Sequence, residues 1–189
     1  SRLMSDAIRS LEPRALWNCF ADLNAVPRPS KKEGKVKAFV REFAARHALE
    51  CIEDSGGNLI VKKPATADRA GHAPVILQAH LDMVHKAADG VSFDFENQGI
   101  DMWIDGDWVR ARGTTLGADN GLGAAAILAV LASKDLSHPP IEALLTIDEE
   151  QGMSGARLLQ GSLLTGKTML NLDSEEDDEF TIGCAGGID

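Results

Sequence analysis

Three largely apolar segments of the chain each end next to a residue that can bind a metal ion. The segments are Pro74–Ala79, Ile141–Ile147 and Thr168–Leu172, and their composition is typical of strands buried in a sheet. A glycine-rich loop, residues 113–120, and an alanine-rich helix from about Gly121 to Ser133 lie between the first two. The alternation of strand and helix predicts an α/β fold, with a mixed, largely parallel sheet and helices on both faces.

The residues before these segments predict packing elements. A helix is expected from Ser10, as its N-cap, to just before Pro27. Ser30 and Glu33 have the spacing of a capping box, which predicts that they begin the next helix. Residues 49–62 predict a strand, a tight Ser-Gly-Gly turn and a second strand. Nothing in the two helices points to chemistry.

Histidine and acidic side chains follow each of the three apolar segments, and another acidic side chain lies in the glycine-rich loop. In open α/β sheets, ligands bind at the carboxyl ends of the strands, so these four sites are expected to converge on one sheet edge. One histidine among several carboxylates suits zinc or another first-row divalent ion, and a carboxylate can bridge two ions. In chain order the residues are His80, Asp82, Asp119, Glu149, Glu150 and Asp173.

Each of these residues also has an interpretation without a metal. His80 could simply be hydrogen-bonded at the end of a strand, and Asp82 could form a salt bridge. Asp119 could be a helix N-cap, and Glu149-Glu150 a solvated turn. Asp173 begins the acidic run 173–179, and such runs are usually exposed loops. The metal hypothesis therefore depends on the combination of residues.

Composition excludes several classes of function. The 189 residues carry a formal net charge of −10, which argues against a nucleic-acid or anionic-membrane partner. No apolar run is long enough to span a bilayer, and no signal peptide is recognised. The three cysteines, Cys19, Cys51 and Cys184, are far apart and odd in number. We therefore expect free thiols and a cytoplasmic location.

Four segments resemble, in order, the metal-binding motifs of the M20 metallopeptidases. They are LQAHLDMV (residues 77–84), RGTTLGADNG (112–121), TIDEEQG (146–152) and NLDSEE (171–176). Together with the final GCAGGID (183–189), they are most similar to the aminoacyl-histidine dipeptidase branch, also called peptidase D or Xaa-His dipeptidase. The resemblance covers residues 11–189 and implies a phosphorylase/hydrolase-like catalytic domain.

The resemblance also implies which residues bind metal. His80 and Asp173 would hold one zinc ion together with Asp119, and Glu150 would share Asp119 at a second zinc ion, with Co²⁺ or Mn²⁺ as possible substitutes. The peptide bond between Asp119 and Asn120 would be cis, as it often is in the family. No residue matches the family's remaining ligand, a histidine near the C-terminus of the full protein. The second zinc ion is therefore expected to bind weakly to this chain.

Two further roles follow from the resemblance. Asp82 would orient His80, and Glu149 would be the general base that activates a water between the two zinc ions. The substrate would be a small peptide, Xaa-His and related dipeptides. Residues 1–189 would be the N-terminal part of the catalytic domain, without the lid or dimerisation domain and the C-terminal part. The fragment would then be inactive, and the full-length protein a homodimer.

Other functions are also compatible with parts of the sequence. Another M20-type amidohydrolase, such as a tripeptidase or an N-acyl amino acid deacylase, is the main alternative. Gly117, Gly121 and Gly123 lie between a strand and a helix as in a phosphate loop, but their spacing fits no nucleotide motif and Asp119 would repel phosphate. A cysteine hydrolase using Cys184 has no histidine nearby in sequence. A metal-bound scaffold without catalysis would not need Glu149.

Overall fold

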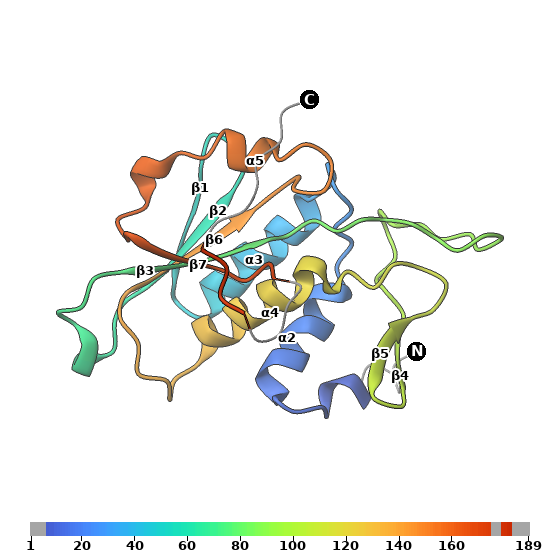
Figure 1. Cartoon of the computed structure of the whole chain (residues 1–189), viewed down its shortest axis with the longest axis horizontal. Coiled ribbons are helices and arrows are strands. Elements are labelled where there is room, and N and C mark those ends of the chain that lie inside the picture. The colour runs from blue at the N-terminus through green and yellow to red at the C-terminus, as the bar shows by residue number, and fades with distance from the viewer. Residues whose placement is uncertain (1–6, 175–178, 183–189) are drawn as a thin grey trace.

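A five-stranded sheet with the strand order β1-β2-β6-β3-β7 forms the centre of the molecule in the computed structural model, which describes residues 7–174 and 179–182 (Figure 1). Both pairs that include β2 are antiparallel, whereas β3 is parallel to β6 and to β7. Only β2 therefore runs against the other strands, as expected for a mixed, largely parallel sheet. The strands are β1 (Glu50–Glu53), β2 (Leu59–Lys63), β3 (Val75–His80), β6 (Ile141–Thr146) and β7 (Thr168–Asn171).

Helices cover both faces of the sheet, as predicted. On one face, α3 (Gly34–Arg46) and α4 (Ala118–Ala132) share a core with the buried side chains of β2, β3 and β6, and α2 (Arg14–Asn24) packs on α4 (Figure 1). On the other face, Leu159, Leu163 and Leu164 pack on a smaller apolar cluster, in the region of α5 (Ser154–Arg157) and the 3₁₀ turn η2 (Gly161–Leu163).

The remaining regular elements are short. A hairpin of β4 (Met102–Asp105) and β5 (Trp108–Ala111) turns near Gly106, and a 3₁₀ turn, η1 (Ala67–Arg69), precedes β3. None of the helices within the described ranges is both long and apolar enough to cross a bilayer.

The helix starts differ from the sequence predictions. Helix α2 begins at Arg14 with Pro13 as its N-cap, and Ser10 Oγ donates to the carbonyl of Ala7. Helix α3 begins at Gly34 without a side-chain cap, so the capping-box prediction is wrong. Ser30 bonds to Asp82, and Glu33 accepts the N–H groups of Lys31 and Asp148, so the two residues do not cap each other.

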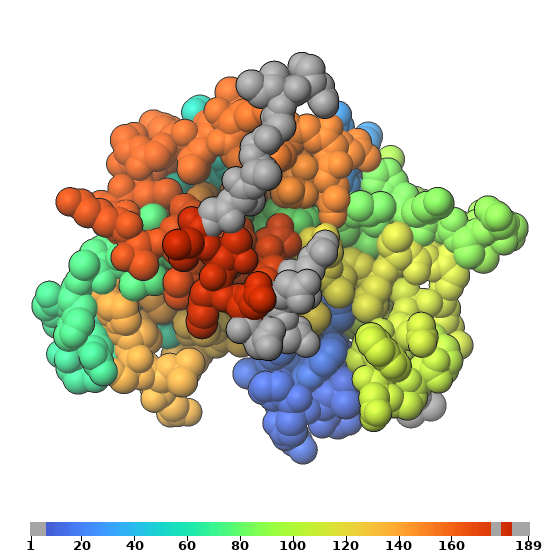
Figure 2. All heavy atoms as spheres, viewed as in Figure 1, coloured from blue at the N-terminus to red at the C-terminus, as the bar shows by residue number. Residues whose placement is uncertain are grey.

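The prediction of three buried strands is correct for β3 and β6 and wrong for β7. All six residues of β6 are buried, but all four residues of β7 are exposed, including Met169 and Leu170. Among the described residues β7 pairs only with β3. The apolar pattern of a strand in the sequence does not show whether another element packs over it. Figure 2 shows the β7 region, in red, at the surface.

Candidate metal centre

The parallel register of three strands brings their carboxyl ends to one edge of the sheet. His80 of β3 lies opposite Thr146, the last residue of β6, and Gln78 lies opposite Asn171, the last residue of β7. The loops that follow β3, β6 and β7 therefore begin side by side. They carry four of the six predicted site residues, His80 is the last residue of β3, and the start of α4 carries Asp119.

His80 lies at the centre of this group and is 1% exposed. Its Nε2 atom lies 3.0 Å from Asp119 Oδ1 and 3.7 Å from Asp173 Oδ2. Ligand atoms of His80, Asp119 and Glu150 all lie within 4.8 Å of one another, a spacing compatible with metal binding between them. The structure thus brings together all four residues that the sequence predicts as ligands.

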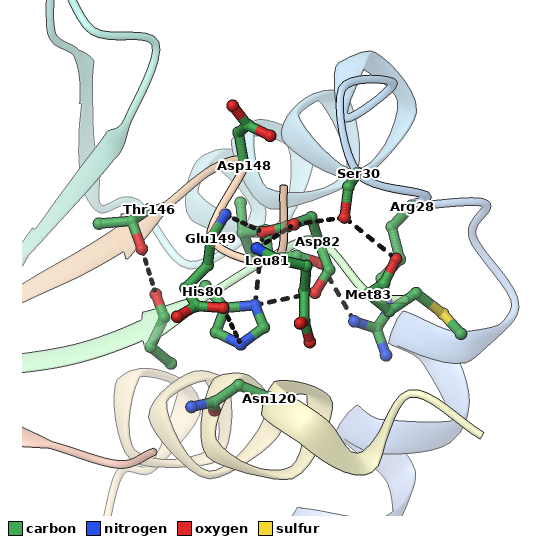
Figure 3. A network of polar contacts seen from close by, with 12 residues as sticks. Arg28, Ser30, His80, Leu81, Asp82, Met83, Asn120, Thr146, Asp148 and Glu149 are labelled. Atoms are coloured by element: carbon green, nitrogen blue, oxygen red, sulfur yellow. Dashed lines mark hydrogen bonds and ion pairs between the residues drawn. The ribbon is translucent and has the colours of Figure 1, made fainter. Parts of the chain in front are cut away.

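Asp82 lies behind His80 and has no exposed surface. The Nδ1 atom of His80 is 2.9 Å from the backbone carbonyl oxygen of Asp82 and 3.3 Å from its carboxylate oxygen Oδ1. Both oxygens are acceptors, so Nδ1 carries a proton, and without a metal ion Nε2 also carries one and donates it to Asp119 Oδ1. A metal ion bound at Nε2 would take the place of that second proton. The carboxylate also accepts the backbone N–H group of Glu149 at 3.0 Å (Figure 3). It accepts the N–H group of Glu150 at 3.3 Å.

Asp119 lies where the glycine-rich loop meets α4. The Asp119–Asn120 peptide bond is cis, which confirms the prediction, and neither residue has helical backbone angles. Regular helix therefore starts at Gly121, as the sequence predicts. The Asn120 side-chain amide donates to the carbonyl of Leu172 at 3.2 Å, which ties the start of α4 to the residue before Asp173. The Asp119 side chain is 64% exposed, in contrast to His80.

The two adjacent glutamates follow β6. Glu149 Oε2 lies 3.9 Å from His80 Nε2, and its side chain is 35% exposed, so it lies near a predicted metal ligand and is open to solvent. Glu150 belongs to the group of possible ligands with His80 and Asp119. Asp148, just before them, is buried and has a left-handed φ of 53°. This turn begins the loop from which both glutamates project.

Charge in the site favours a cation. Burial lowers the pKa of His80, but hydrogen bonds and charges from Asp82, Asp173 and Asp119 outweigh burial and raise it to about 9. Burial raises the pKa of Glu149 and Glu150, and the carboxylates around them raise it further. Burial and the Asp119 charge likewise raise the pKa of Asp173. The same negative field that holds a proton on the imidazole would attract a divalent ion in its place, so the donor set fits a metal.

The pKa of Asp82 is shifted in the opposite direction. Burial raises its pKa, but hydrogen bonds from His80, Ser30 and the Glu149 N–H outweigh burial and lower it to about 2. Asp82 therefore remains a carboxylate and an acceptor for His80 at neutral pH.

Three residues near this site had no functional role in the sequence prediction. Ser30 Oγ donates to Asp82 Oδ2 at 2.6 Å, and Glu33 Oε1 accepts the backbone N–H of Asp148 at 3.0 Å. The buried Arg28 guanidinium donates to the carbonyls of Leu81 and Gly117. The flanking prolines, which exclude helix at residues 27–29, are the one sequence signal for an extended segment here.

Some predictions concern parts of the chain that the structure does not describe. Cys184, the final segment 183–189 and residues 175–178 of the acidic run lie outside the described residues. Cys19 and Cys51 are free thiols, as expected.

Comparison with known proteins connects this geometry to a family. The model of peptidase family M20/M25/M40 matches residues 76–184, which is more than half of the chain. The cytosol non-specific dipeptidase of Escherichia coli (strain K12) is 46% identical over 182 residues, 96% of this chain and 38% of that protein.

Solved structures agree with this match. The aminoacylhistidine dipeptidase of Vibrio alginolyticus superposes with a TM-score of 0.86 at 46% identity, covering 90% of this chain and 35% of that one. The aminopeptidase PepT of Bacillus cereus superposes with a TM-score of 0.73 at 28% identity. The match covers 88% of this chain and 44% of PepT. The chain thus spans little more than a third of the length of the two dipeptidases. Family match, sequence identity and fold agree, and the chain belongs to peptidase family M20/M25/M40.

Proposed function

We propose that the protein is a metallodipeptidase that holds two zinc ions and hydrolyses Xaa-His and related dipeptides. One observation carries this proposal: a buried histidine, hydrogen-bonded from behind, presents Nε2 to a cluster of carboxylates at the carboxyl edge of the sheet. The 46% identity to proteins named as dipeptidases supports the reaction class.

The proposed ligands are His80, Asp119 and Asp173 for one ion, and Asp119 and Glu150 for the other. Asp119 suits the shared position because it is the most exposed of these carboxylates and lies 3.0 Å from His80 Nε2. When bound, two such ions would polarise the scissile carbonyl and lower the pKa of a water between them. Zinc suits one imidazole with several carboxylates, and Co²⁺ or Mn²⁺ offer similar coordination.

Glu149 is the proposed general base. Its carboxylate lies 3.9 Å from His80 Nε2 and is still open to solvent, so it can reach both a water and a peptide in the site. Burial and the surrounding carboxylates raise its pKa, which makes it a better proton acceptor at neutral pH. Glu149 would take a proton from the attacking water and return it to the leaving amine. Asp82 would keep His80 in the required tautomer.

We also propose that residues 1–189 are the N-terminal part of the catalytic domain of a longer protein. The chain covers 38% of the E. coli dipeptidase, and β7 leaves Met169 and Leu170 exposed. These side chains line an apolar groove of about 820 Å³ between β7 and α4. The remaining part of the catalytic domain would cover it, and the fragment alone would be inactive. A homodimer of the full-length protein stays a prediction, and the name of the E. coli relative supports a cytosolic location.

Hydrolysis assays test this function. The full-length protein should hydrolyse β-alanyl-histidine and several other dipeptides, and a chelator should abolish the activity until zinc is returned. A tripeptide and an N-acyl amino acid in the same panel test the alternative amidohydrolases. Preference for either of these over every dipeptide would overturn the dipeptidase assignment, and full activity in chelator would overturn the metal mechanism.

A further inference from the structure

The connection between α2 and α3, residues 25–33, lies directly beside the loop after β3, which follows His80 and carries Asp82 and Met83. The Met83 N–H donates to the Arg28 carbonyl at 3.1 Å, and the Ser30 N–H donates to the Met83 carbonyl at 3.3 Å. Pro29 and Met83 form a parallel β-bridge. A segment far from the metal motifs in sequence therefore forms one wall behind the site.

Ser30 links this connection to two loops of the site. Its hydroxyl donates to Asp82 Oδ2 at 2.6 Å, and both side chains are buried, so solvent does not compete (Figure 3). The same carboxylate accepts the N–H groups of Glu149 and Glu150. The buried Asp82 carboxylate thus joins residues 25–33, the loop after His80 and the loop that carries Glu149. Hydrogen bonds to an ionised group are stronger than those between neutral groups.

Glu33 independently links residues 25–33 to the loop after β6, which carries Asp148 and Glu149. Its Oε1 atom accepts the N–H of Asp148 at 3.0 Å and the N–H of Lys31 at 2.9 Å. Asp148 has a left-handed φ of 53°, which non-glycine residues seldom adopt without support. The bond from Glu33 fixes this turn immediately before the two glutamates.

We propose that Ser30 and Glu33 are positioning residues of the site, acting through Asp82 and the 148–150 backbone to aim His80 Nε2 and the Glu149 carboxylate. Neither side chain bonds to a proposed metal ligand, so their effect is on orientation. The inference rests on the proposed function for its kinetic consequence, but its structural consequence can be measured separately.

Paired substitutions in the full-length protein test this role. Ser30→Ala removes the donor, whereas Ser30→Thr keeps a hydroxyl. Glu33→Ala removes the acceptor, whereas Glu33→Gln keeps a carbonyl oxygen at the same reach. Ser10→Ala, a serine whose hydroxyl bonds only locally to Ala7, is the control. Circular dichroism at the assay temperature restricts the comparison to folded protein.

We expect kcat to fall about tenfold in Ser30→Ala and in Glu33→Ala, with KM within about twofold, because support behind a metal site is commonly worth that much. Ser30→Thr and Glu33→Gln should recover most of the loss. A residue that only stabilised the fold would lower the melting temperature and leave kcat of the folded protein unchanged, and this outcome would overturn the proposal.

Hydrogen exchange of the metal-free protein separates this inference from the proposed function. The amides of residues 148–150 should exchange faster in Ser30→Ala and Glu33→Ala than in the wild type, with β6 unchanged. Unchanged exchange at 148–150 would overturn the positioning role even if the enzyme is active. Faster exchange in the two variants, together with a wild-type protein that hydrolyses no dipeptide, would leave the positioning role standing and reject the proposed function.

Discussion

Strands β3 and β7 lie next to each other and both deliver a predicted metal ligand, yet their surroundings differ. β3 is paired on both sides, and His80 at its end is 1% exposed. β7 has one partner among the described residues, and all its residues are exposed. The His80 side of the site is therefore supported by the core and by hydrogen bonds, whereas the Asp173 side depends on a strand that the described residues leave uncovered.

The largest expected effect concerns the proposed base on the supported side. Glu149→Gln in the full-length protein should lower kcat about 10²- to 10⁴-fold, the range that general bases contribute, because the amide cannot accept the proton. Metal content should remain that of the wild type, since Glu149 is not a proposed ligand. Parallel kinetics and metal analysis measure both.

Glu42→Gln is the matched control, because Glu42 is an exposed glutamate of α3 and is not one of the site residues. Its kinetics should equal those of the wild type. Retained turnover in Glu149→Gln would remove Glu149 from the mechanism, and loss of metal would make it a ligand instead.

The two kinds of strand should also differ in stability. In the 189-residue chain, Leu145→Ala in β6 should lower the free energy of unfolding by about 2–5 kcal/mol, because Leu145 is fully buried. Leu170→Ala in β7 should change it by less than about 0.5 kcal/mol, because Leu170 is 49% exposed. Urea unfolding measures both. Equal losses would mean that β7 is covered in solution and that the contrast between the strands is wrong.

A smaller effect is expected where Arg28 supports the loop that carries Asp119. A Cβ at Gly117 would lie 2.6 Å from Arg28 Nη2, and Gly117 has φ of 75°. Gly117→Ala should therefore cost about 2–4 kcal/mol, combining the left-handed backbone with overpacking.

Gly106→Ala isolates the backbone contribution. Gly106 has φ of 60° with no atom within 4 Å of an added Cβ, so its substitution should cost only about 1 kcal/mol. Thermal unfolding of both variants gives the difference. Equal costs would show that the Arg28 guanidinium does not constrain the loop.

The positions of the predicted ligands followed from the sequence because apolar segments and the residues after them carry that information locally. His80, Glu150 and Asp173 each follow such a segment, and parallel pairing brings the strand ends together. Ser30 and Glu33 show where local reasoning fails. Their spacing is that of a capping box, but whether a hydroxyl bonds to its own helix or to Asp82 depends on tertiary contacts that spacing does not encode.

The exposure of β7 was missed for a related reason. The apolar sequence of β7 predicts that something packs against this strand. It does not show whether that element lies among the residues that the structure describes. Composition also could not identify Arg28 as a buried cation beneath the site, because most arginines are exposed.

Zinc titration of the metal-free 189-residue chain tests the central claim most directly. The His80–Asp119–Asp173 group should bind one zinc ion per chain, with any second ion much weaker, and His80→Ala should abolish the strong site. His72→Ala, which removes an exposed histidine away from the site, should bind like the wild type. Zinc binding by His80→Ala with wild-type affinity, or two tight ions per wild-type chain, would contradict the account.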